Sequence, residues 1–348
     1  MITVKETDFP ALRDEWLALE EGGHIPTIFQ NYDWMETWWK HLGFRGTKLI
    51  LAAYDGKELI GIAPLYISKL TVKGVPLFNV AHLIGAGESD YQAFILKMGK
   101  EETALRELLL HLRRYKWDLF WLSDVHPGTA TNQLIPDSLK TAGYYFVYQQ
   151  HTPCPYISLP GTYDEYKQSL SRNSRRNLTK FCNRIKSLEG MQYAKVTQME
   201  HLKGAMDNFF YLHQNRWERE GQKGALAEEK VRDFHREAAS RLFRYLDLKQ
   251  LTLKDRVIAT TYSYDFGGTR GVYLPGMDMD FEYYSLGFVM MGFGIRDAIT
   301  CGLREFDFMR GDEEYKFHFT KTVRYNMRYF FAKNSIKFKV FCKLEGLS

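Results

Sequence analysis

The chain has 348 residues, of which 45% are hydrophobic and 26% are charged, a composition typical of a folded globular protein rather than a disordered one. The net charge of +5 favours anionic ligands but is too small to indicate nucleic acid as the main partner. No stretch approaches the ~18 apolar residues that a membrane-spanning helix needs. We therefore expect at most peripheral contact with a membrane.

The four cysteines lie far apart without a CxxC pair, and the ten histidines show no metal-ligand spacing. We expect neither a disulfide framework nor a structural or catalytic metal. The amino terminus carries acidic residues and no apolar segment of signal-peptide length. Both features favour a cytoplasmic protein.

Helical and extended patterns alternate through the first 150 residues. Residues 1–45 read as helical, and residues 48–67 predict a hairpin that turns at Asp55-Gly56, a dipeptide that tight primed turns favour. The elements that follow are predicted as strands at 77–85 and 91–96, a helix at 102–115, a strand at 117–124, a helix at 129–142 and a strand at 144–149. Three prolines then interrupt the pattern, and we place a domain boundary after residue 152 because proline does not fit inside a central strand or helix.

A long helix with one strongly basic side is predicted for residues 163–188. Its basic residues follow one another without an intervening acid: Lys167, Arg172, Arg175, Arg176, Lys180, Arg184 and Lys186. Such a run is usually a solvated face. The alternative is an arm that contacts phosphate, because a guanidinium group binds phosphate through two parallel hydrogen bonds.

The rest of the chain predicts a strand, two helices, an antiparallel meander over 249–276, a helix over 286–301 and a strand over 304–309. It ends in a predicted hairpin that turns at Asn334-Ser335. The order of hairpin, strand, polar loop, helix and strand repeats that of the first half. This repetition predicts an α/β protein of two similar lobes, residues 1–152 and 153–348, each a mixed, largely antiparallel sheet flanked by helices.

The stretch FDFMRGDEEYK begins as a strand and breaks at Gly311 into a cluster of charges. A strand end is held rigidly by its sheet, while the loop that leaves it can present an acid, a phenol and an amine to a cleft. The candidates here are Asp312 as the preferred base, then Glu313, Tyr315 and Lys316, with Arg310 as a substrate contact. The structural alternatives are a solvated helix start for the acids and a packed ring with a snorkelling amine for Tyr315 and Lys316.

Two further pairs are weaker candidates for substrate binding. Asp90 and Tyr91 leave a glycine-containing loop and either line an acceptor cleft or cap a turn. Arg216 and Trp217 share a helical turn, where they would bind an acidic group and stack on a sugar unless they belong to the core.

Six short segments follow one another along the chain in a characteristic order and spacing: GIAPLY, SDYQAF, SRNSRRNL, LHQNRW, YYSLG and FDFMRGDEEYKF. Their combination resembles the acetyltransferase-like family typified by the CelD proteins of cellulose biosynthesis, in the GNAT superfamily. The chain is also similar to the FemABX peptidyltransferases, which carry two GNAT-like lobes and a strand followed by a Phe-Lys element like the one ending at Lys316. The resemblance implies an incomplete first lobe and an active cleft in the second.

The resemblance also implies direct transfer of an acyl group, from acetyl-CoA or another acyl-CoA, to an amine or hydroxyl of a saccharide, nucleotide-sugar or envelope precursor. The donor turn of the superfamily, Q/R-x-x-G-x-G/A, is reduced here, and its place is taken by Ser285, Leu286, Gly287 and Phe288. Exposed N–H groups and the helix dipole at this turn still favour a pyrophosphate. Two alternatives stay open: aminoacyl transfer from aminoacyl-tRNA to a peptidoglycan precursor, and a non-catalytic binding protein. The oligomeric state is left open as well.

Overall fold

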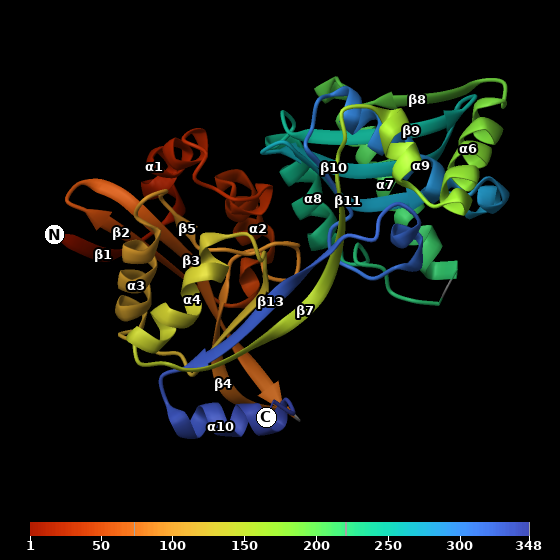
Figure 1. Cartoon of the computed structure of the whole chain (residues 1–348). Helices are drawn as coiled ribbons and strands as arrows, with labels where there is room; N and C mark the ends of the chain where they lie inside the picture. Colours follow the sequence, from red (N-terminus) through yellow and green to blue (C-terminus); the bar gives the residue numbers. More distant parts are fainter. Residues whose placement is uncertain (73, 220, 348) are drawn as a thin grey trace. The chain divides into compact units, whose positions relative to one another are not determined.

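The structure is a computed structural model that describes residues 1–72, 74–219 and 221–347 (Figure 1). The chain forms two compact units, unit 1 of Met1–Thr152 with Tyr325–Ser348 and unit 2 of Pro153–Arg324. The sequence pattern assigned residues 325–348 to the second lobe. That assignment differs from the structure, in which this segment packs in unit 1.

Unit 1 is built around a mixed sheet with the strand order β1-β2-β3-β4-β6-β13, and β5 pairs with β3. Its strands are β1 (Ile2–Thr7), β2 (Thr47–Asp55), β3 (Glu58–Val72), β4 (Val75–Leu83), β5 (Ile95–Leu96), β6 (Leu119–Val125) and β13 (Val323–Ala332). Its helices are α1 (Phe9–Glu21), α2 (Tyr32–Leu42), α3 (Glu101–Leu112), α4 (Ala130–Thr141) and α10 (Ser335–Leu344), with short 3₁₀ turns η1 (Ile28–Gln30) and η2 (Gly43–Arg45). Apolar residues of β2, β3, α3 and α4 form its main core.

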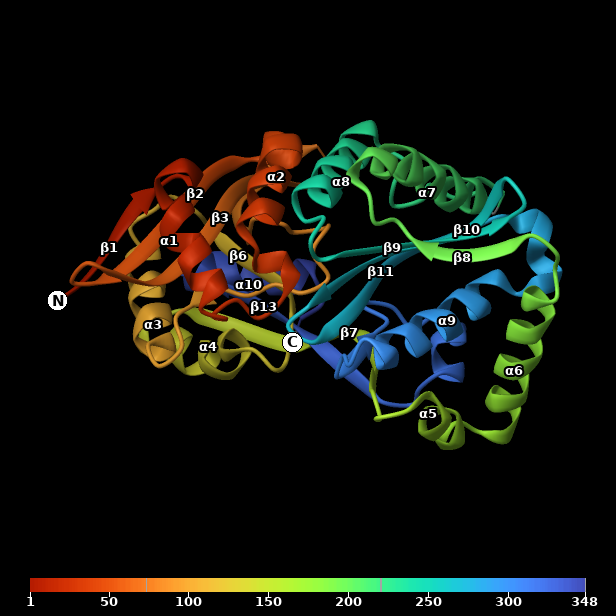
Figure 2. The ribbon, with the colours of Figure 1, turned by 90° about the horizontal axis from the view of Figure 1, so that it is seen from above.

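Unit 2 has the strand order β7-β12-β11-β10-β9-β8. Its strands are β8 (Met191–Lys195), β9 (Leu246–Leu253), β10 (Arg256–Phe266), β11 (Thr269–Met277) and β12 (Glu305–Asp307), joined by the end of β7 (Tyr145–Ser158). Its helices are α5 (Tyr163–Ser169), α6 (Arg172–Lys186), α7 (Met199–Arg219), α8 (Glu229–Arg241) and α9 (Leu286–Thr300), with 3₁₀ turns η3 (Met279–Tyr284) and η4 (Glu314–His318). Figure 2 shows α7 and α8 on one face of this sheet and α9 on the other.

Both units use the same succession of elements. In unit 1 the antiparallel strands β2, β3 and β4 precede α3, and β6 then pairs with β4 in parallel. In unit 2 the antiparallel strands β9, β10 and β11 precede α9, and β12 then pairs with β11 in parallel. The predicted α/β class, with mixed and largely antiparallel sheets flanked by helices, is confirmed.

The structure corrects two predictions about strands. Residues 1–45 are not all helical, because Ile2–Thr7 alternates inward and outward residues and pairs with the edge of β2 as strand β1. Strand β7 continues through Pro153 and Pro155, where the sequence pattern predicted a break. The prolines fit because these positions only accept hydrogen bonds, from the N–H groups of Gly311 (2.9 Å) and Phe308 (3.0 Å).

Two further predictions, one of a helix and one of a hairpin, are also wrong. The helix expected over 163–188 is two helices, because Leu170 is extended and Ser171 caps α6 by accepting a hydrogen bond from the N–H of Ser174 (3.1 Å). The hairpin expected at the end is strand β13 followed by α10. Asn334 starts this helix by accepting hydrogen bonds from the N–H groups of Ile336 (2.9 Å) and Lys337 (3.1 Å).

Candidate active site

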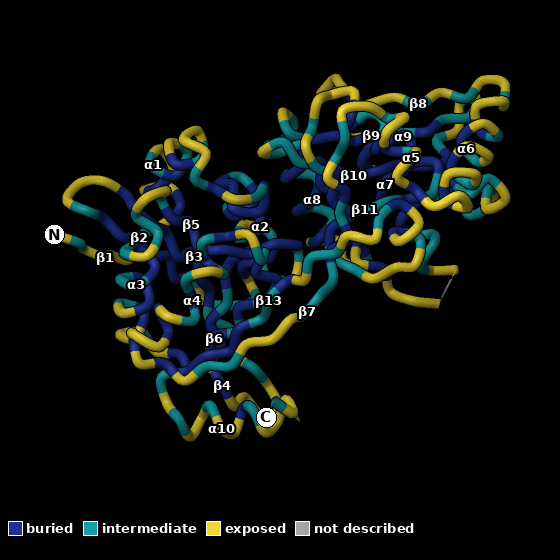
Figure 3. The backbone as a smooth tube through the Cα atoms, viewed as in Figure 1, coloured by how far each residue is buried: buried dark blue, intermediate teal, exposed yellow. Residues whose placement is uncertain are grey.

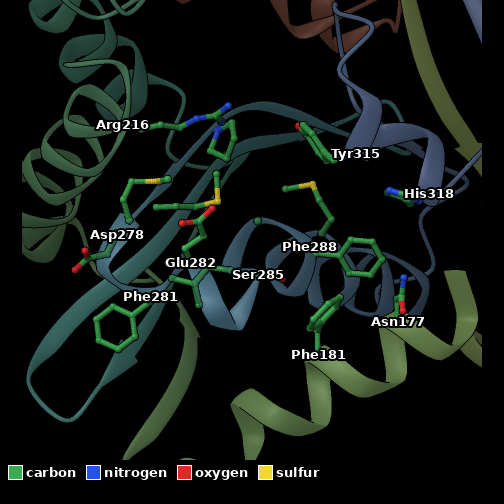
Figure 4. A pocket seen from close by; sticks show the side chains of 16 residues that line it. Asn177, Phe181, Arg216, Asp278, Phe281, Glu282, Ser285, Phe288, Tyr315 and His318 are labelled. Atoms are coloured by element: carbon green, nitrogen blue, oxygen red, sulfur yellow. The ribbon is translucent and has the colours of Figure 1, made fainter. Parts of the chain in front are cut away.

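A cavity of about 460 Å³ lies in unit 2 at the start of α9 (Figure 4). Its apolar lining residues are Phe181, Pro275, Met277, Met279, Phe281, Leu286, Phe288 and Met291. Its polar or glycine lining residues are Asn177, Arg216, Asp278, Glu282, Ser285, Gly287, Tyr315 and His318. A largely apolar cavity with a few convergent polar groups is the usual form of a small-molecule site.

The amino-terminal end of α9 opens onto this cavity. The first intrahelical hydrogen bond runs from the N–H of Val289 to the carbonyl of Ser285 (3.1 Å), so the N–H groups of Leu286, Gly287 and Phe288 precede it. These three residues and Ser285 line the cavity, and none of the first-turn side chains is acidic. The helix dipole adds partial positive charge at the same place, which favours an anion.

The turn that starts α9 has an unusual backbone. Ser285 adopts the left-handed conformation (φ 51°, ψ 52°) and its side chain makes no capping hydrogen bond. This conformation is costly for a residue with a side chain and is easily adopted by glycine. Glycine at position 287 keeps the turn open, since a Cβ atom there would lie 2.7 Å from the Sδ atom of Met277 and would force that flexible side chain to move.

The cavity exists because two parallel strands separate. Strands β11 and β12 pair only from Thr269↔Glu305 to Gly271↔Asp307. The carboxylate of Asp307 then accepts a hydrogen bond from the N–H of Met309 (2.7 Å), whose left-handed backbone (φ 58°) turns the chain away. Strand β11 continues to Met277, and its last residues line the cavity.

Tyr315 and Arg216 face each other across one side of the cavity. Figure 4 shows the Tyr315 hydroxyl and the Arg216 guanidinium pointing toward one another. Burial, and then the negative charge of Glu313, raise the pKa of the Tyr315 phenol well above its usual range. The phenol is therefore protonated at neutral pH, and its hydroxyl can donate a hydrogen bond.

Trp217 does not line the cavity but fixes its wall. Its indole N–H donates to Nε2 of His213 (3.1 Å), and Nδ1 of His213 donates to the carbonyl of Pro275 (2.9 Å). Burial lowers the pKa of His213, which keeps the ring neutral as this pair of bonds requires. Arg216 lies over the Trp217 ring at 5.5 Å.

The loop that follows β12 is organised by a buried lysine. The side chain of Lys316 is 3% exposed, and its ammonium group donates to the carbonyl of Arg310 (2.7 Å) and forms an ion pair with Glu313 (2.8 Å). Asp312 and Glu313 are exposed, and neither they nor Lys316 and Arg310 line the cavity. These four predicted site residues therefore lie outside the lining of this cavity, and the Lys316 ammonium group contacts its own loop.

Asp90 and Tyr91 are buried inside unit 1. Tyr91 is 3% exposed and its ring packs edge-on against His126 (4.7 Å) and Phe29 (6.2 Å). The carbonyl of Asp90 accepts a hydrogen bond from the side-chain amide of Asn326 (2.9 Å). These contacts favour the alternative reading of this pair as structural residues.

The sequence reasoning missed several residues that line the cavity, among them Glu282 and His318. Glu282 lies three residues before Ser285 and therefore takes the first place of the Q/R-x-x-G-x-G/A turn, with Ser285 and Gly287 at its glycine places. Aligning the motif from its first residue would have found it. Figure 4 shows the Glu282 carboxylate pointing into the middle of the cavity.

His318 also lines a second cavity of about 630 Å³ in unit 2. Most of its other lining residues carry hydroxyl, amide or aromatic groups: Ser158, Tyr166, Ser169, Ser171, Asn173, Ser174, Phe317, Phe319, Thr320 and Thr322. Lys321 adds a positive charge, and the lining contains no acidic side chain. This composition suits a hydroxyl-rich or anionic ligand.

Within residues 1–72, 74–219 and 221–347, no group of three or more His, Cys, Asp or Glu side chains is arranged to hold a metal ion. The same part of the chain contains no helix both long enough and apolar enough to cross a membrane.

Comparison with known proteins gives one family match and several structural matches. Residues 172–317, all within unit 2, match the profile of a family described as acetyltransferase (GNAT) domain. No curated protein matches the chain by sequence.

The structural matches span nearly the whole chain. FemX is 13% identical with a TM-score of 0.65, over 98% of this chain and 99% of that one. A conserved protein of unknown function from Bacteroides thetaiotaomicron is 13% identical with a TM-score of 0.55, over 95% and 99%. L-PGS from Bacillus licheniformis is 11% identical with a TM-score of 0.54, over 89% and 94%. At these identities the likeness concerns the fold, and the chain thus shares the FemX fold and carries a match to an acetyltransferase (GNAT) domain in unit 2.

Proposed function

We propose that the protein is an acyltransferase that moves an acyl group, most simply acetyl, from acyl-CoA to an amine or hydroxyl by direct transfer. One observation carries the proposal: the first turn of α9, whose N–H groups at Leu286, Gly287 and Phe288 precede the first intrahelical hydrogen bond, lines a largely apolar cavity that Tyr315 also lines. The finer relation to CelD-like proteins is part of the same proposal.

The donor fits this cavity in two respects. The helix N-terminus offers backbone donors and a dipole to a pyrophosphate. The walls formed by Met277, Leu286 and Met291 suit the methylene-rich arm that carries the thioester. Glu282 is the feature that does not fit, because its carboxylate at the mouth of the helix repels a phosphate.

The chemistry requires a proton acceptor and a proton donor. The acceptor nitrogen or oxygen forms a bond to the acyl carbon, and the carbon–sulfur bond breaks with its electron pair on sulfur. Tyr315 gives its proton to the leaving thiolate and is reprotonated from solvent. His318 takes the proton that the acceptor loses, and Arg216 stabilises the negative charge that develops on the carbonyl oxygen.

The second cavity is the proposed acceptor site. His318 lines both cavities, so an acceptor bound in the second cavity would lie next to the proposed proton acceptor. Its hydroxyl and amide lining suits a saccharide, and Lys321 suits a phosphate or carboxylate on it. A nucleotide-sugar or another anionic envelope precursor fits this description.

A second candidate function is aminoacyl transfer from aminoacyl-tRNA. Glu282 favours it, because a carboxylate at the donor mouth pairs better with the amine of an aminoacyl group than with a pyrophosphate. The exposed basic side of α6, which includes Arg172, Arg176 and Lys180 and carries no acid, would then contact the tRNA backbone.

Calorimetric titration with acetyl-CoA, together with thiol release over a panel of amino sugars and nucleotide-sugars, tests the leading proposal. We expect binding, and thiol release that depends on the acceptor. Absence of both, with salt-dependent tRNA binding that Arg172→Glu and Arg176→Glu abolish, would favour the second candidate. Arg175 is left unchanged because it donates to the carbonyls of Gln168 (2.8 Å) and Leu170 (3.2 Å) and holds the α5–α6 turn.

A further inference from the structure

Helix α10 in unit 1 exposes an apolar stripe. Ile336 is 70% exposed, Val340 is 47% exposed and Leu344 is 52% exposed. These residues are spaced by four, so they lie one above the other on one side of the helix. Figure 3 shows exposed segments along α10. Exposing three aliphatic side chains in one row is costly unless something covers them.

The opposite side of α10 is fixed to unit 1. Phe341 is 1% exposed, and its ring packs against Phe330 (5.0 Å) and Phe78 of β4 (6.4 Å). Lys337 forms an ion pair with Asp118. The helix therefore cannot roll to bury its stripe without breaking these contacts.

Lysines flank the stripe on both sides. At 100° per residue, Lys343 and Lys337 each lie about 60° from the centre of the stripe at Val340, and Lys339 lies about 100° from it. Lys339 and Lys343 are exposed, and α10 contains no acidic residue. An apolar row with a lysine border is the pattern of a helix that lies in the boundary layer of a bilayer.

This charge pattern distinguishes between possible occupants. A second copy of the chain docked symmetrically through the same face would bring the lysines of one copy against those of the other. An anionic lipid surface accepts both features, because the aliphatic side chains enter the headgroup layer while the lysines reach phosphates through their long stems.

We propose that α10 docks the protein on an anionic phospholipid bilayer, with Ile336, Val340 and Leu344 inserted and Lys339 and Lys343 against lipid phosphates. Strand β4, which contacts α10 through Phe78, also carries exposed Val75 (56%) and Leu77 (46%). The proposal does not depend on the reaction proposed for unit 2.

Co-flotation of the full chain with vesicles tests the proposal. The vesicles are phosphatidylcholine alone or phosphatidylcholine mixed with phosphatidylglycerol. We expect binding to the anionic vesicles that weakens with salt, and binding to the neutral ones at least about tenfold weaker. The variant Ile336→Ser/Val340→Ser/Leu344→Ser should lose at least about tenfold in binding. The variant Lys339→Glu/Lys343→Glu should lose about fivefold or more per lysine.

A matched control removes three exposed apolar side chains elsewhere in unit 1, at Phe44 (61%), Met98 (57%) and Leu110 (39%). These serine substitutions should leave vesicle binding unchanged, and circular dichroism should show that all variants are folded. Failure of the wild-type chain to float with anionic vesicles would overturn the proposal. So would equal binding by the α10 and control variants, or a concentration-dependent dimer that the α10 serine variant alone dissociates.

Discussion

The starts of α3 and α9 occupy the same place in the succession of the two units, yet their chemistry is opposite. Helix α3 carries Glu101 and Glu102 in its first turn, so its own carboxylates neutralise the positive end of the helix. Helix α9 has no acid in its first turn and opens onto a cavity. The first turn of α9 therefore carries no acid of its own, although the Glu282 carboxylate also lines the cavity, and this difference between the two helix starts supports the proposal that unit 2 carries the donor site.

The ends of the parallel strands differ in the same way. Both carry a left-handed residue near this end, Asp124 within β6 (φ 56°) and Met309 after β12 (φ 58°). In unit 1 this turn is tied down, since the carbonyl of Asp124 accepts from the N–H of Gln92 (2.7 Å) and its carboxylate accepts from Asn326 (3.5 Å). In unit 2 the corresponding turn is also held, by Asp307 and Lys316, but it leads to Tyr315, which lines the cavity.

Tyr315→Phe should have the largest effect if unit 2 alone carries the chemistry. Loss of a general acid lowers turnover by about 10²- to 10⁴-fold, whereas the affinity for acetyl-CoA should stay within about twofold. Because the folded-state pKa of Tyr315 lies above its usual value of about 10, wild-type turnover should persist through pH 10 and fall only above it. Steady-state kinetics and calorimetry measure the two quantities. Unchanged turnover in a folded variant would remove Tyr315 from the mechanism.

Lys316→Met should have the next largest effect, on stability. It leaves the carbonyl of Arg310 without its buried donor and Glu313 without its ion pair, at a cost of about 2–4 kcal/mol in the free energy of unfolding. Urea denaturation measures the loss. The exposed Lys321→Met serves as control and should change stability by less than about 0.5 kcal/mol. Full stability with lost turnover would instead return Lys316 to a catalytic role.

Glu282→Gln sharpens the comparison between the two helix starts. Removing the carboxylate makes the mouth of α9 more favourable to pyrophosphate, and we expect acetyl-CoA to bind about three- to tenfold more tightly, most clearly at low salt. Calorimetry with Glu189→Gln, an exposed residue outside the cavity, provides the control. Weaker acetyl-CoA binding in Glu282→Gln would contradict this repulsion and show that the carboxylate instead accepts a hydrogen bond from the donor or positions the turn that binds it.

Ser285→Gly should have the smallest effect. Glycine adopts the left-handed backbone at this position without the steric cost, and the free energy of unfolding should rise by about 0.5–1 kcal/mol. Lys254→Gly is a matched control, because Lys254 has the same left-handed backbone (φ 54°) in a turn away from the cavity. Both should raise the melting temperature, and only the change at Ser285 should alter donor affinity. Destabilisation by Ser285→Gly would show that the serine side chain has a role that its geometry does not reveal.

Local signals predicted much of the fold. The Asp55-Gly56 turn, the meander over 249–276 and the start of α9 at Leu286 depend on neighbouring residues, and the structure places them as expected. Strand β1 was not predicted, because its extended conformation depends on pairing with β2 and not on neighbouring residues. Helix α10 was not predicted, because an asparagine such as Asn334 caps a helix as readily as it makes a turn.

The sequence allowed the donor turn of the candidate site to be predicted, but not which acidic and basic side chains line the cavity. The positions of Ser285 to Phe288 follow from a helix start, which is local. The direction of the Lys316 side chain does not, because it depends on the carbonyls that a left-handed turn at Met309 places within its reach. Asp312 was preferred as base for its place after Gly311, but Glu282 and His318 reach the cavity from segments that only the folded sheet brings together.

The central claim is that the backbone amides at the start of α9 bind the donor pyrophosphate. Titration of the isotope-labelled protein with CoA, followed by amide NMR shifts, tests it most directly. We expect the largest shifts at the N–H groups of Leu286, Gly287 and Phe288, with little change along α6. Shifts concentrated on Arg172 to Lys186, with none at the start of α9, would contradict it.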